Sequence, residues 1–498
     1  MDSTPNEWVE LERTLSELAA SGTIEVHEDG QWLAELADLH FEVHLAGKNP
    51  LIHLWSEEQN LTRQVVRVKE RKDHKLILEV RRFGKKKPGR LEFIQRGDTR
   101  RPNRITREQF SARFGRILTE KFPDAVVDSL TASQDLRNSF SGLYVRGTMH
   151  EGARAWVVLA AGPNEAASVE KMLSFGILWL DWCRNRTDKR AIEGLRLFVP
   201  EGTARSLRER ALGLSSRAKV EIFEIREPDS LIQRVDAADA GNLESYLAPR
   251  SEFETAITIA SDTIARIRAM LPRDSDAIAL RVPAGTGEVA FCFRGLEFAR
   301  RTSEGVFFGA DGSFERLTFD SEPRLRKQLH DLDVHRNPLA GDANHRLYRN
   351  WPERWLESIV LKDPAKLDAM LDPEHFYSQV PALAAGDRGV LDLLGITRRG
   401  RLVVIELKAS EDIQMPLQAV DYWLRVRRHQ REGDFQRYGY FTGVEIDSRP
   451  PLVWLVAPAI RFHSATEILL RYLSPEIQIT RIGLNEQWRR GMKVMLRQ

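Results

Sequence analysis

Charged side chains interrupt an otherwise apolar stretch, GVLDLLGITRRGRLVVIELKAS, at residues 389–410. Successive side chains on a strand point to opposite faces. Glu406 and Lys408 therefore share one face, while Ile405 and Leu407 take the other. A surface ion pair on an exposed strand is the plain alternative, but the stretch around these two residues is too apolar for it.

A second carboxylate, Asp392, precedes the turn that Arg398-Arg399-Gly400 is expected to make, so a hairpin brings it toward Glu406 and Lys408. Two buried carboxylates repel each other unless a positive charge holds them. Hard cations such as Mg²⁺ take oxygen ligands. The pattern predicts a divalent-metal site, to which the backbone carbonyl of Leu407 could add an oxygen. Lys408 would orient or help to deprotonate an attacking water beside a metal-polarised phosphoryl group.

The next segment, residues 416–432, has the periodicity of a helix. Gln418, Tyr422, Arg425 and His429 recur at helical spacing and are predicted to share a polar face. Gln418 and Tyr422 would support the site or contact a phosphate. The alternatives are a surface glutamine and a tyrosine at the edge of the core. Arg425 and His429 are expected on a solvated face.

Upstream, Glu353 and Glu357 lie one turn apart on the predicted helix PERWLESIVL. Glu357 lies between apolar positions and is the better candidate for a further metal or water ligand. A solvated helix acid is the alternative.

Together these residues resemble the PD-(D/E)xK nuclease superfamily, and within it the NucS-like and Mrr-like branch. The resemblance covers residues 350–445 and rests on an acid, a 14-residue gap, E-x-K on a strand and Q-x-x-x-Y on the next helix. Those positions are Asp392, Glu406, Lys408, Gln418 and Tyr422. Leu391 stands where the family has a proline, a departure that removes no ligand.

The resemblance implies that Asp392 and Glu406 bind Mg²⁺ or Mn²⁺ and that Lys408 is the catalytic lysine. Gln418 and Tyr422 would match the helix motif, and Glu357 the acid of the first helix. It implies a Mg²⁺-dependent deoxyribonuclease, expected to be an endonuclease, acting in DNA repair, restriction or phage defence. The alternative is a catalytically inactive nucleic-acid-binding or scaffold protein with a nuclease-like fold. RNA as the substrate is not excluded.

With 498 residues, the chain is too long for one domain. We expect an α/β (overall α+β) multidomain protein in which a central mixed sheet is flanked by helices. The predicted regions are a basic β-rich domain (1–104), a nuclease-like α/β domain (105–235), an intermediate α+β module (236–349) and the nuclease domain (350–498). Within the last, strands are predicted over 437–443 and 452–458.

The second and fourth regions look like copies, because both run helix, strand, strand, long helix, strand, helix, strand. In the second, the positions that match Glu406 and Lys408 fall within the apolar residues 159–162, Ser174 replaces Gln418 and Leu178 replaces Tyr422. We therefore predict a degenerate copy that pairs with the nuclease domain as in a homodimer. Coincidence is the alternative, and different strand orders would contradict duplication.

Basic side chains concentrate between Thr62 and Arg104, where 16 Lys and Arg face five Asp and Glu, although the whole chain has a net charge of +2. This is typical of a surface that binds nucleic acid. A solvated face is the alternative. The predicted contact residues are Arg67, Lys69, Arg81, Arg82, Lys85, Lys86, Lys87 and Arg90.

Two cysteines, Cys183 and Cys292, are too few for a disulfide framework or a cysteine zinc cluster and fit a reducing cytoplasm. The acidic, polar start MDSTPNEWVE predicts no signal peptide. The longest apolar run, 172–183, is too short to span a bilayer, so we expect no membrane contact. No Walker motif occurs, so any ATPase or helicase would come from a protein partner. A homo-oligomer stays possible.

Overall fold

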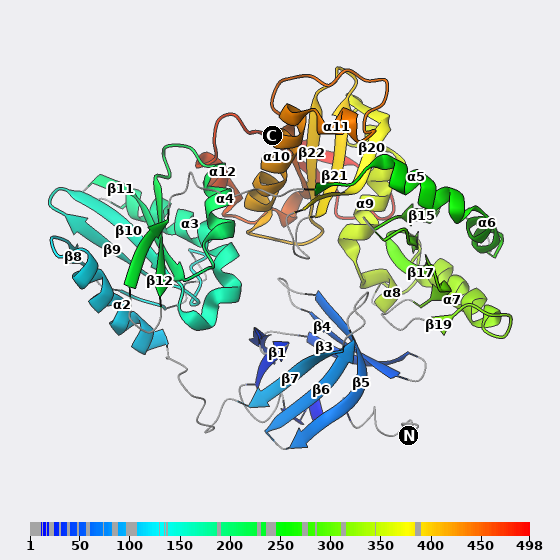
Figure 1. The fold of residues 1–498 in the computed structure, drawn as a ribbon, viewed down its shortest axis with the longest axis horizontal. Helices are drawn as coiled ribbons and strands as arrows, with labels where there is room; N and C mark the ends of the chain where they lie inside the picture. The colour runs from blue at the N-terminus through cyan, green and yellow to red at the C-terminus, as the bar shows by residue number, and fades with distance from the viewer. Residues whose placement is uncertain are drawn as a thin grey trace. The chain divides into compact units, whose positions relative to one another are not determined.

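The structure is a computed structural model of the chain (Figure 1). Contacts divide the chain into two compact units. The first holds residues 1–100, 248–362 and 487–491, and the second holds 101–247, 363–486 and 492–498. The described residues are 11, 13–15, 17–18, 24–28, 31–36, 40–46, 49–55, 60–72, 74–81, 88–95, 107–128, 130–133, 135, 138–186, 191–226, 231–235, 246–270, 277–283, 286–309, 315–343, 345–383 and 390–498.

The strands of the described residues form four separate sheets, and helices accompany them. The chain is therefore a mixed α/β, multidomain protein, as expected. None of the described helices is both long and apolar enough to cross a membrane.

The first sheet of the first unit is antiparallel, in the order β2-β1-β7-β6-β5-β4-β3. Its strands are β1 (Ile24–Glu28), β2 (Gln31–Glu35), β3 (His40–Ala46), β4 (Asn49–Trp55), β5 (Asn60–Lys72), β6 (Lys75–Arg81) and β7 (Gly89–Gln95). Alternate residues of β7, such as Leu91 and Phe93, are fully buried. Three leucines at helical spacing, Leu11, Leu15 and Leu18, pack into the same core.

The second sheet of this unit is also antiparallel, in the order β15-β16-β17-β18-β19. Its strands are β15 (Ile278–Arg281), β16 (Val289–Phe293), β17 (Leu296–Thr302), β18 (Gly305–Phe308) and β19 (Glu315–Arg316). The helices of this part are α5 (Arg250–Ile259), α6 (Ser261–Ala269), α7 (Glu322–His335), α8 (Arg346–Arg349) and α9 (Pro352–Lys362).

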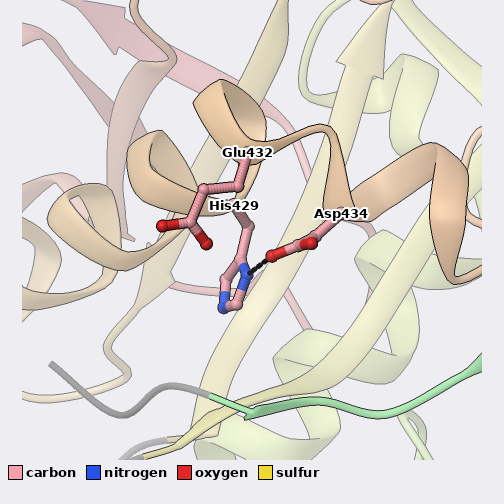
Figure 2. A group of neighbouring side chains, drawn as sticks. All are labelled: His429, Glu432 and Asp434. Atoms are coloured by element: carbon pink, nitrogen blue, oxygen red, sulfur yellow. Dashed lines mark hydrogen bonds and ion pairs between the residues drawn. The ribbon is translucent and has the colours of Figure 1, made fainter. Parts of the chain in front are cut away.

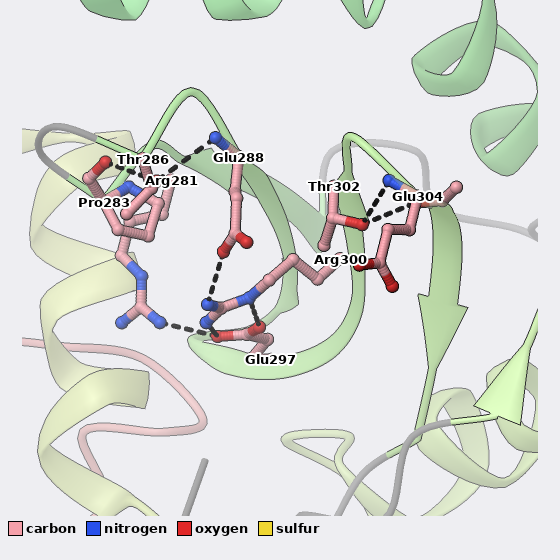
Figure 3. A network of polar contacts seen from close by, with 9 residues as sticks. Arg281, Pro283, Thr286, Glu288, Glu297, Arg300, Thr302 and Glu304 are labelled. Carbon is pink, nitrogen blue, oxygen red and sulfur yellow. Dashed lines mark hydrogen bonds and ion pairs between the residues drawn. The ribbon is translucent and has the colours of Figure 1, made fainter. Parts of the chain in front are cut away.

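Ion pairs cross one face of this second sheet (Figure 3). Arg300 donates to Glu297 at 2.7 Å and to Glu288 at 3.0 Å. Arg281 donates to the same Glu297 at 2.6 Å. Each guanidinium in this network therefore has a carboxylate partner.

The second unit contains two sheets. The first has the order β13-β12-β11-β10-β9-β8, from β8 (Val126–Val127), β9 (Val145–Glu151), β10 (Arg154–Ala160), β11 (Ala191–Pro200), β12 (Val220–Arg226) and β13 (Leu231–Val235). Its helices are α2 (Arg107–Lys121), α3 (Met172–Arg184) and α4 (Arg205–Ala211). Phe110 and Phe114 of α2 pack on Phe198 and Phe223 of the sheet.

The other sheet has the order β14-β20-β21-β22-β23-β24-β25. The strands are β14 (Tyr246–Leu247), β20 (Leu371–Leu383), β21 (Val390–Thr397), β22 (Leu402–Leu407), β23 (Leu452–Pro458), β24 (Gln478–Leu484) and β25 (Val494–Arg497). Its helices are α10 (Met415–Glu432), α11 (Asp434–Arg437) and α12 (Thr466–Arg471). Gly400, with φ +81°, makes the expected turn between β21 and β22.

One strand predicted in this region is wrong. Residues 437–443, RYGYFTG, end the short helix α11 and then turn instead of extending. Gly439, Phe441 and Gly443 all have positive φ angles, which no regular strand permits. Tyr440 and Phe441 are buried in the core by this turn, so tertiary packing overrides their preference for strands.

Strands β8–β13 of one sheet and β20–β25 of the other have the same order and direction, while β14 adds an edge strand to the second sheet alone. In each, an antiparallel pair (β9 and β10, or β21 and β22) is followed by two parallel neighbours and then by an antiparallel strand. A long helix, α3 or α10, follows the second strand of each pair, and a short helix, α4 or α12, comes later. The topology is therefore the one that a duplication requires.

The two halves also share one apolar core and meet in a reciprocal backbone contact. The amide of Ser215 donates to the Tyr472 carbonyl at 2.9 Å, and the amide of Ser474 donates to the Gly213 carbonyl at 2.8 Å. A Cβ on Gly213 would lie 2.2 Å from Val420 of α10, so glycine permits this close approach. Such reciprocity is the mark of a twofold, self-complementary interface.

Side-chain contacts extend the interface on both sides of this backbone pair. Arg210 of α4 donates to Asp421 of α10 at 2.8 Å. Burial raises the pKa of the Asp421 carboxyl, and the Arg210 guanidinium opposes that shift. Asp181 of α3 accepts from the Tyr472 hydroxyl at 3.1 Å. Each half therefore supplies polar partners to the long helix of the other.

Candidate functional site

The candidate site lies at the carboxyl end of β22, a strand with every residue buried. Glu406 is 2% exposed. The backbone amide of Lys408 donates to the Val456 carbonyl at 3.0 Å, which extends the pairing with β23 by one residue. The Lys408 ammonium lies 3.1 Å from a Glu406 carboxylate oxygen. The alternative of an exposed surface ion pair is therefore wrong.

Asp392 lies in β21, the antiparallel neighbour of β22. Leu393 pairs with Ile405 in the register of these two strands. Asp392 and Glu406 occupy the next position of each strand beyond this pair. The side chain of Asp392 is outside the described residues, so its role as a ligand remains a prediction.

A third carboxylate near Lys408 was not predicted from the sequence. Asp412 lies 3.3 Å from the Lys408 ammonium through one oxygen, and its other oxygen accepts from the backbone amide of Gln414 at 2.7 Å. Asp412 therefore ties the lysine to the residue that precedes α10. Its signal in the sequence was the four-residue spacing from Lys408.

Gln418 lies in the first turn of α10, and its side-chain oxygen is buried. Among the described residues, no hydrogen-bond partner contacts that oxygen. A buried polar atom without a partner costs free energy. A polar guest at this position would remove that cost. Tyr422, one turn later, packs partly buried against the shared core, close to Arg210.

The solvated face expected for Arg425 and His429 is wrong. Arg425 approaches Glu209 of the other half to 3.8 Å and is mostly buried. His429 is 3% exposed and lies 2.8 Å from Asp434. Both partners come from other elements, which the helical spacing alone does not reveal.

His429, Glu432 and Asp434 form a second group of possible metal ligands, at the far end of α10 (Figure 2). Their ligand atoms lie within 4.8 Å of one another, close enough to hold a metal ion. Protein partners already engage them, however. Arg437 donates to Asp434 at 2.6 Å, and Arg428 donates to Glu432 at 2.9 Å. The group therefore fits a structural role, in which the hydrogen bond between His429 and Asp434 connects α10 to α11.

Glu357, the predicted further ligand, belongs to α9 in the first unit. It is 5% exposed, so the alternative of a solvated acid is wrong. Arg354 donates to its carboxylate at 2.8 Å. It also lies near Cys292, whose thiol pKa burial raises to about 11.

The predicted basic surface is partly described. Arg67 and Lys69 of β5 are exposed, and both contact Glu79 of β6, at 2.9 and 3.0 Å. Hydrogen bonds from these two cations lower the pKa of Glu79. Arg90 lies 2.9 Å from Glu92. Nearby acids on β6 and β7 thus offset part of the charge that a count along the sequence suggests.

Arg81 is exposed at the end of β6. Four other predicted contact residues lie outside the described residues: Arg82, Lys85, Lys86 and Lys87.

No protein-family model matches the chain. No curated protein matches it. Among solved structures, the chain is similar to a repair endonuclease from Pyrococcus abyssi, with 13% identity and a TM-score of 0.16. The match covers 46% of this chain and 98% of that one. At this TM-score, the likeness carries no weight for the fold or the activity of this chain.

Proposed function

We propose that the chain is a metal-dependent nuclease that hydrolyses phosphodiester bonds of DNA, with its active site at the carboxyl end of β22. The contact between the buried carboxylate of Glu406 and the partly buried ammonium of Lys408, 3.1 Å apart, carries the proposal. Burying two charges costs desolvation free energy that an apolar pair of the same size avoids. The neighbouring residues of β22 are apolar, so this placement favours a chemical use.

Mg²⁺ or Mn²⁺ fits the proposed ligands, because hard cations prefer carboxylate and carbonyl oxygens. We assign Asp392, Glu406 and the backbone carbonyl of Leu407 as ligands. Glu357 belongs to the first unit, so its role as a further ligand stays a prediction from the sequence. The unpartnered, buried oxygen of Gln418 supports a polar guest near the start of α10. When bound, the metal would polarise the scissile phosphoryl group and acidify a water.

Lys408 is the proposed catalytic lysine. Carboxylates on two sides, from Glu406 and Asp412, fix the position of its ammonium group. From there it would donate a hydrogen bond to the attacking water or to the negative charge that develops on the phosphate. Gln418 and Tyr422 would orient the phosphate or the water from the first turns of α10.

The other half of the second unit is proposed to be a partner without a site of its own. Residues 159–162 offer no carboxylate at the end of β10. Ser174, at the position aligned with Gln418, donates to Gln414 at 2.9 Å, and Leu178 is buried in the shared core. This half would therefore support α10 of the catalytic half, as a second subunit would.

The wider biological role is also a proposal. The exposed Arg67 and Lys69 favour contact with the phosphates of DNA, with an affinity that falls as salt rises. Both cysteines are buried and neither forms a disulfide, which fits the reducing cytoplasm. Restriction, repair and phage defence stay equal candidates, as do assembly with an ATPase or helicase partner and homo-oligomer formation. The NucS-like and Mrr-like branch is proposed on the residues alone.

A cleavage assay tests the proposal. Plasmid, single-stranded, flap and mismatched DNA are incubated with the full chain and Mg²⁺ or Mn²⁺. We expect cleavage that stops with a metal chelator and in Asp392→Ala and Lys408→Ala. Lys493→Ala, which changes an exposed lysine of the same unit, serves as the matched control. Cleavage that survives both site variants would overturn the site, and DNA binding without cleavage would favour an inactive binding protein.

A further inference from the structure

A cavity in the first unit has no role in the proposed active site. Its volume is 510 Å³, and helix α9 and the sheet of β15–β19 contribute to its wall. Among the described residues that line it, four are basic and none is acidic: the basic ones are Arg268, Arg294, Lys362 and Arg489. Ligand cavities of 300–1,000 Å³ are common in proteins. This one therefore combines the size of a ligand site with a single sign of charge.

The helix α9 presents one face to this cavity. Trp355, Ser358, Ile359 and Lys362, at helical spacing, line it. The ion pair between Arg354 and Glu357 does not line it. The carboxylate of Glu357, next in sequence to the lining residue Ser358, is thus paired with Arg354 and does not line the cavity.

Arg489 is the most unusual of the lining residues. Its guanidinium lies over the rings of Trp488 at 4.2 Å, Tyr348 at 5.0 Å and Trp355 at 5.3 Å. Its Nε atom is buried and has no hydrogen-bond partner among the described residues. Burial lowers the pKa of Arg489. The aromatic rings hold the group in place, but no described carboxylate forms a salt bridge with it.

A second arginine, Arg336, lies near Arg489 and also has no salt bridge with a described carboxylate. Arg336 is completely buried and donates to backbone carbonyls, among them those of Asn350 at 2.7 Å and Leu347 at 2.8 Å. Burial, with the nearby Arg489 and Arg294, lowers its pKa to about 9. Carbonyls satisfy its hydrogen bonds without neutralising its charge. Arg336 therefore adds a further positive charge near the four basic residues that line the cavity.

The contrast with the rest of this part of the chain is marked. Arg281 and Arg300 are paired with carboxylates (Figure 3), and so are Arg266 and Arg324. Buried or half-buried cations are normally paired in proteins. An anion that enters the cavity would supply the counter-charge that the described side chains around Arg489 do not.

We propose that this cavity binds the phosphoryl group of a ligand, independently of the nuclease site. Arginine and lysine side chains recognise phosphate through charge-assisted hydrogen bonds. Two sources offer that chemistry: a free nucleotide and the backbone of a nucleic acid. The rings of Trp355 and Trp488, at 1% and 2% exposure, already pack on the guanidinium of Arg489. Recognition therefore rests on the phosphoryl group.

Calorimetry on the full chain tests this proposal with three probes in the presence of a metal chelator: inorganic phosphate, ADP and a short single-stranded oligonucleotide. The test variant is Arg268→Gln with Lys362→Gln, two exposed side chains whose loss leaves the core intact. The control is Lys327→Gln, an exposed lysine of α7 outside the cavity. Thermal unfolding checks that all three proteins are folded.

We expect at least one probe to bind, with an affinity about tenfold or more lower in the double variant and unchanged in the control. Binding of ADP but not of the oligonucleotide identifies a free nucleotide as the source, and the reverse identifies a nucleic acid. The proposal fails if no probe binds, or if the double variant binds each probe as the wild type does. Neither outcome depends on cleavage activity.

Discussion

The two halves of the second unit have the same topology and differ most at one point. At the end of β22 stand Glu406 and Lys408, whereas the end of β10 continues into the apolar residues 159–162. Both strands are nevertheless almost entirely buried in their sheets. The comparison teaches that the apolar pattern specifies the sheet, while a few charges at one strand end specify the proposed chemistry.

The largest expected effect comes from removing the charge that only one half carries. Glu406→Gln should lower the cleavage rate by about 10²–10³-fold, because it removes a proposed metal ligand. With a single site, the wild type should convert supercoiled plasmid to open circles before any linear product forms. Gel electrophoresis over time measures both. Linear product that appears at once, or a loss of only half the rate, would mean that the other half also cleaves.

A smaller effect is expected at the ion pair that joins the halves. Asp421→Asn leaves the mostly buried Arg210 without its counter-charge, so the free energy of unfolding should fall by about 3 kcal/mol. Urea unfolding measures this change. Replacing both residues, Arg210→Met with Asp421→Leu, should recover most of it. A single variant as stable as the wild type would show that the two halves do not depend on this pair.

The close approach of the halves gives the third prediction. Gly213→Ala places a Cβ 2.2 Å from Val420, so the free energy of unfolding should fall by about 1–3 kcal/mol. Gly341→Ala, where nothing lies within 4 Å of the new Cβ, is the control and should change it by less than about 0.5 kcal/mol. Urea unfolding compares the two, and equal effects would contradict the packed interface.

The smallest expected effect tests whether the partner half supports the active one. Ser174→Ala removes the hydrogen bond to Gln414, which also bonds Asp412 through its backbone amide. We expect a loss of about 1 kcal/mol in stability. We also expect a cleavage rate that falls by less than about tenfold. Steady-state cleavage kinetics measure the second change. An unchanged rate would limit this half to a structural role.

The sheet pattern could be predicted where local preference and tertiary packing agree. The alternation in residues 41–95 and the apolar strand 402–407 both match the observed strands, whereas β1 and β2 were not predicted. Prediction failed at 437–443, where aromatic residues favour a strand but glycines and a buried turn prevail. Packing between distant segments decides such cases, and a sequence window does not contain it.

The candidate site shows the same limit at the level of side chains. The contact between Glu406 and Lys408 follows from a spacing of two on a strand, so the sequence was sufficient for it. The partners of Arg425 and His429 come from α4 and α11, and the helical period cannot name them. Asp412 could have been proposed as a partner of Lys408 from the sequence, because the two residues are only four positions apart.

The reciprocal bonds between residues 213–215 and 472–474 join two surfaces that belong to one covalent chain. A pair of separate subunits falls apart on dilution, but a tethered pair keeps a high effective concentration at any protein level. In a symmetric dimer every substitution appears twice across the interface. Here each surface varies alone, so Arg210 can face Asp421 on one side while Asp181 faces Tyr472 on the other. Covalent linkage thus allows the residues of the two halves to diverge independently of each other.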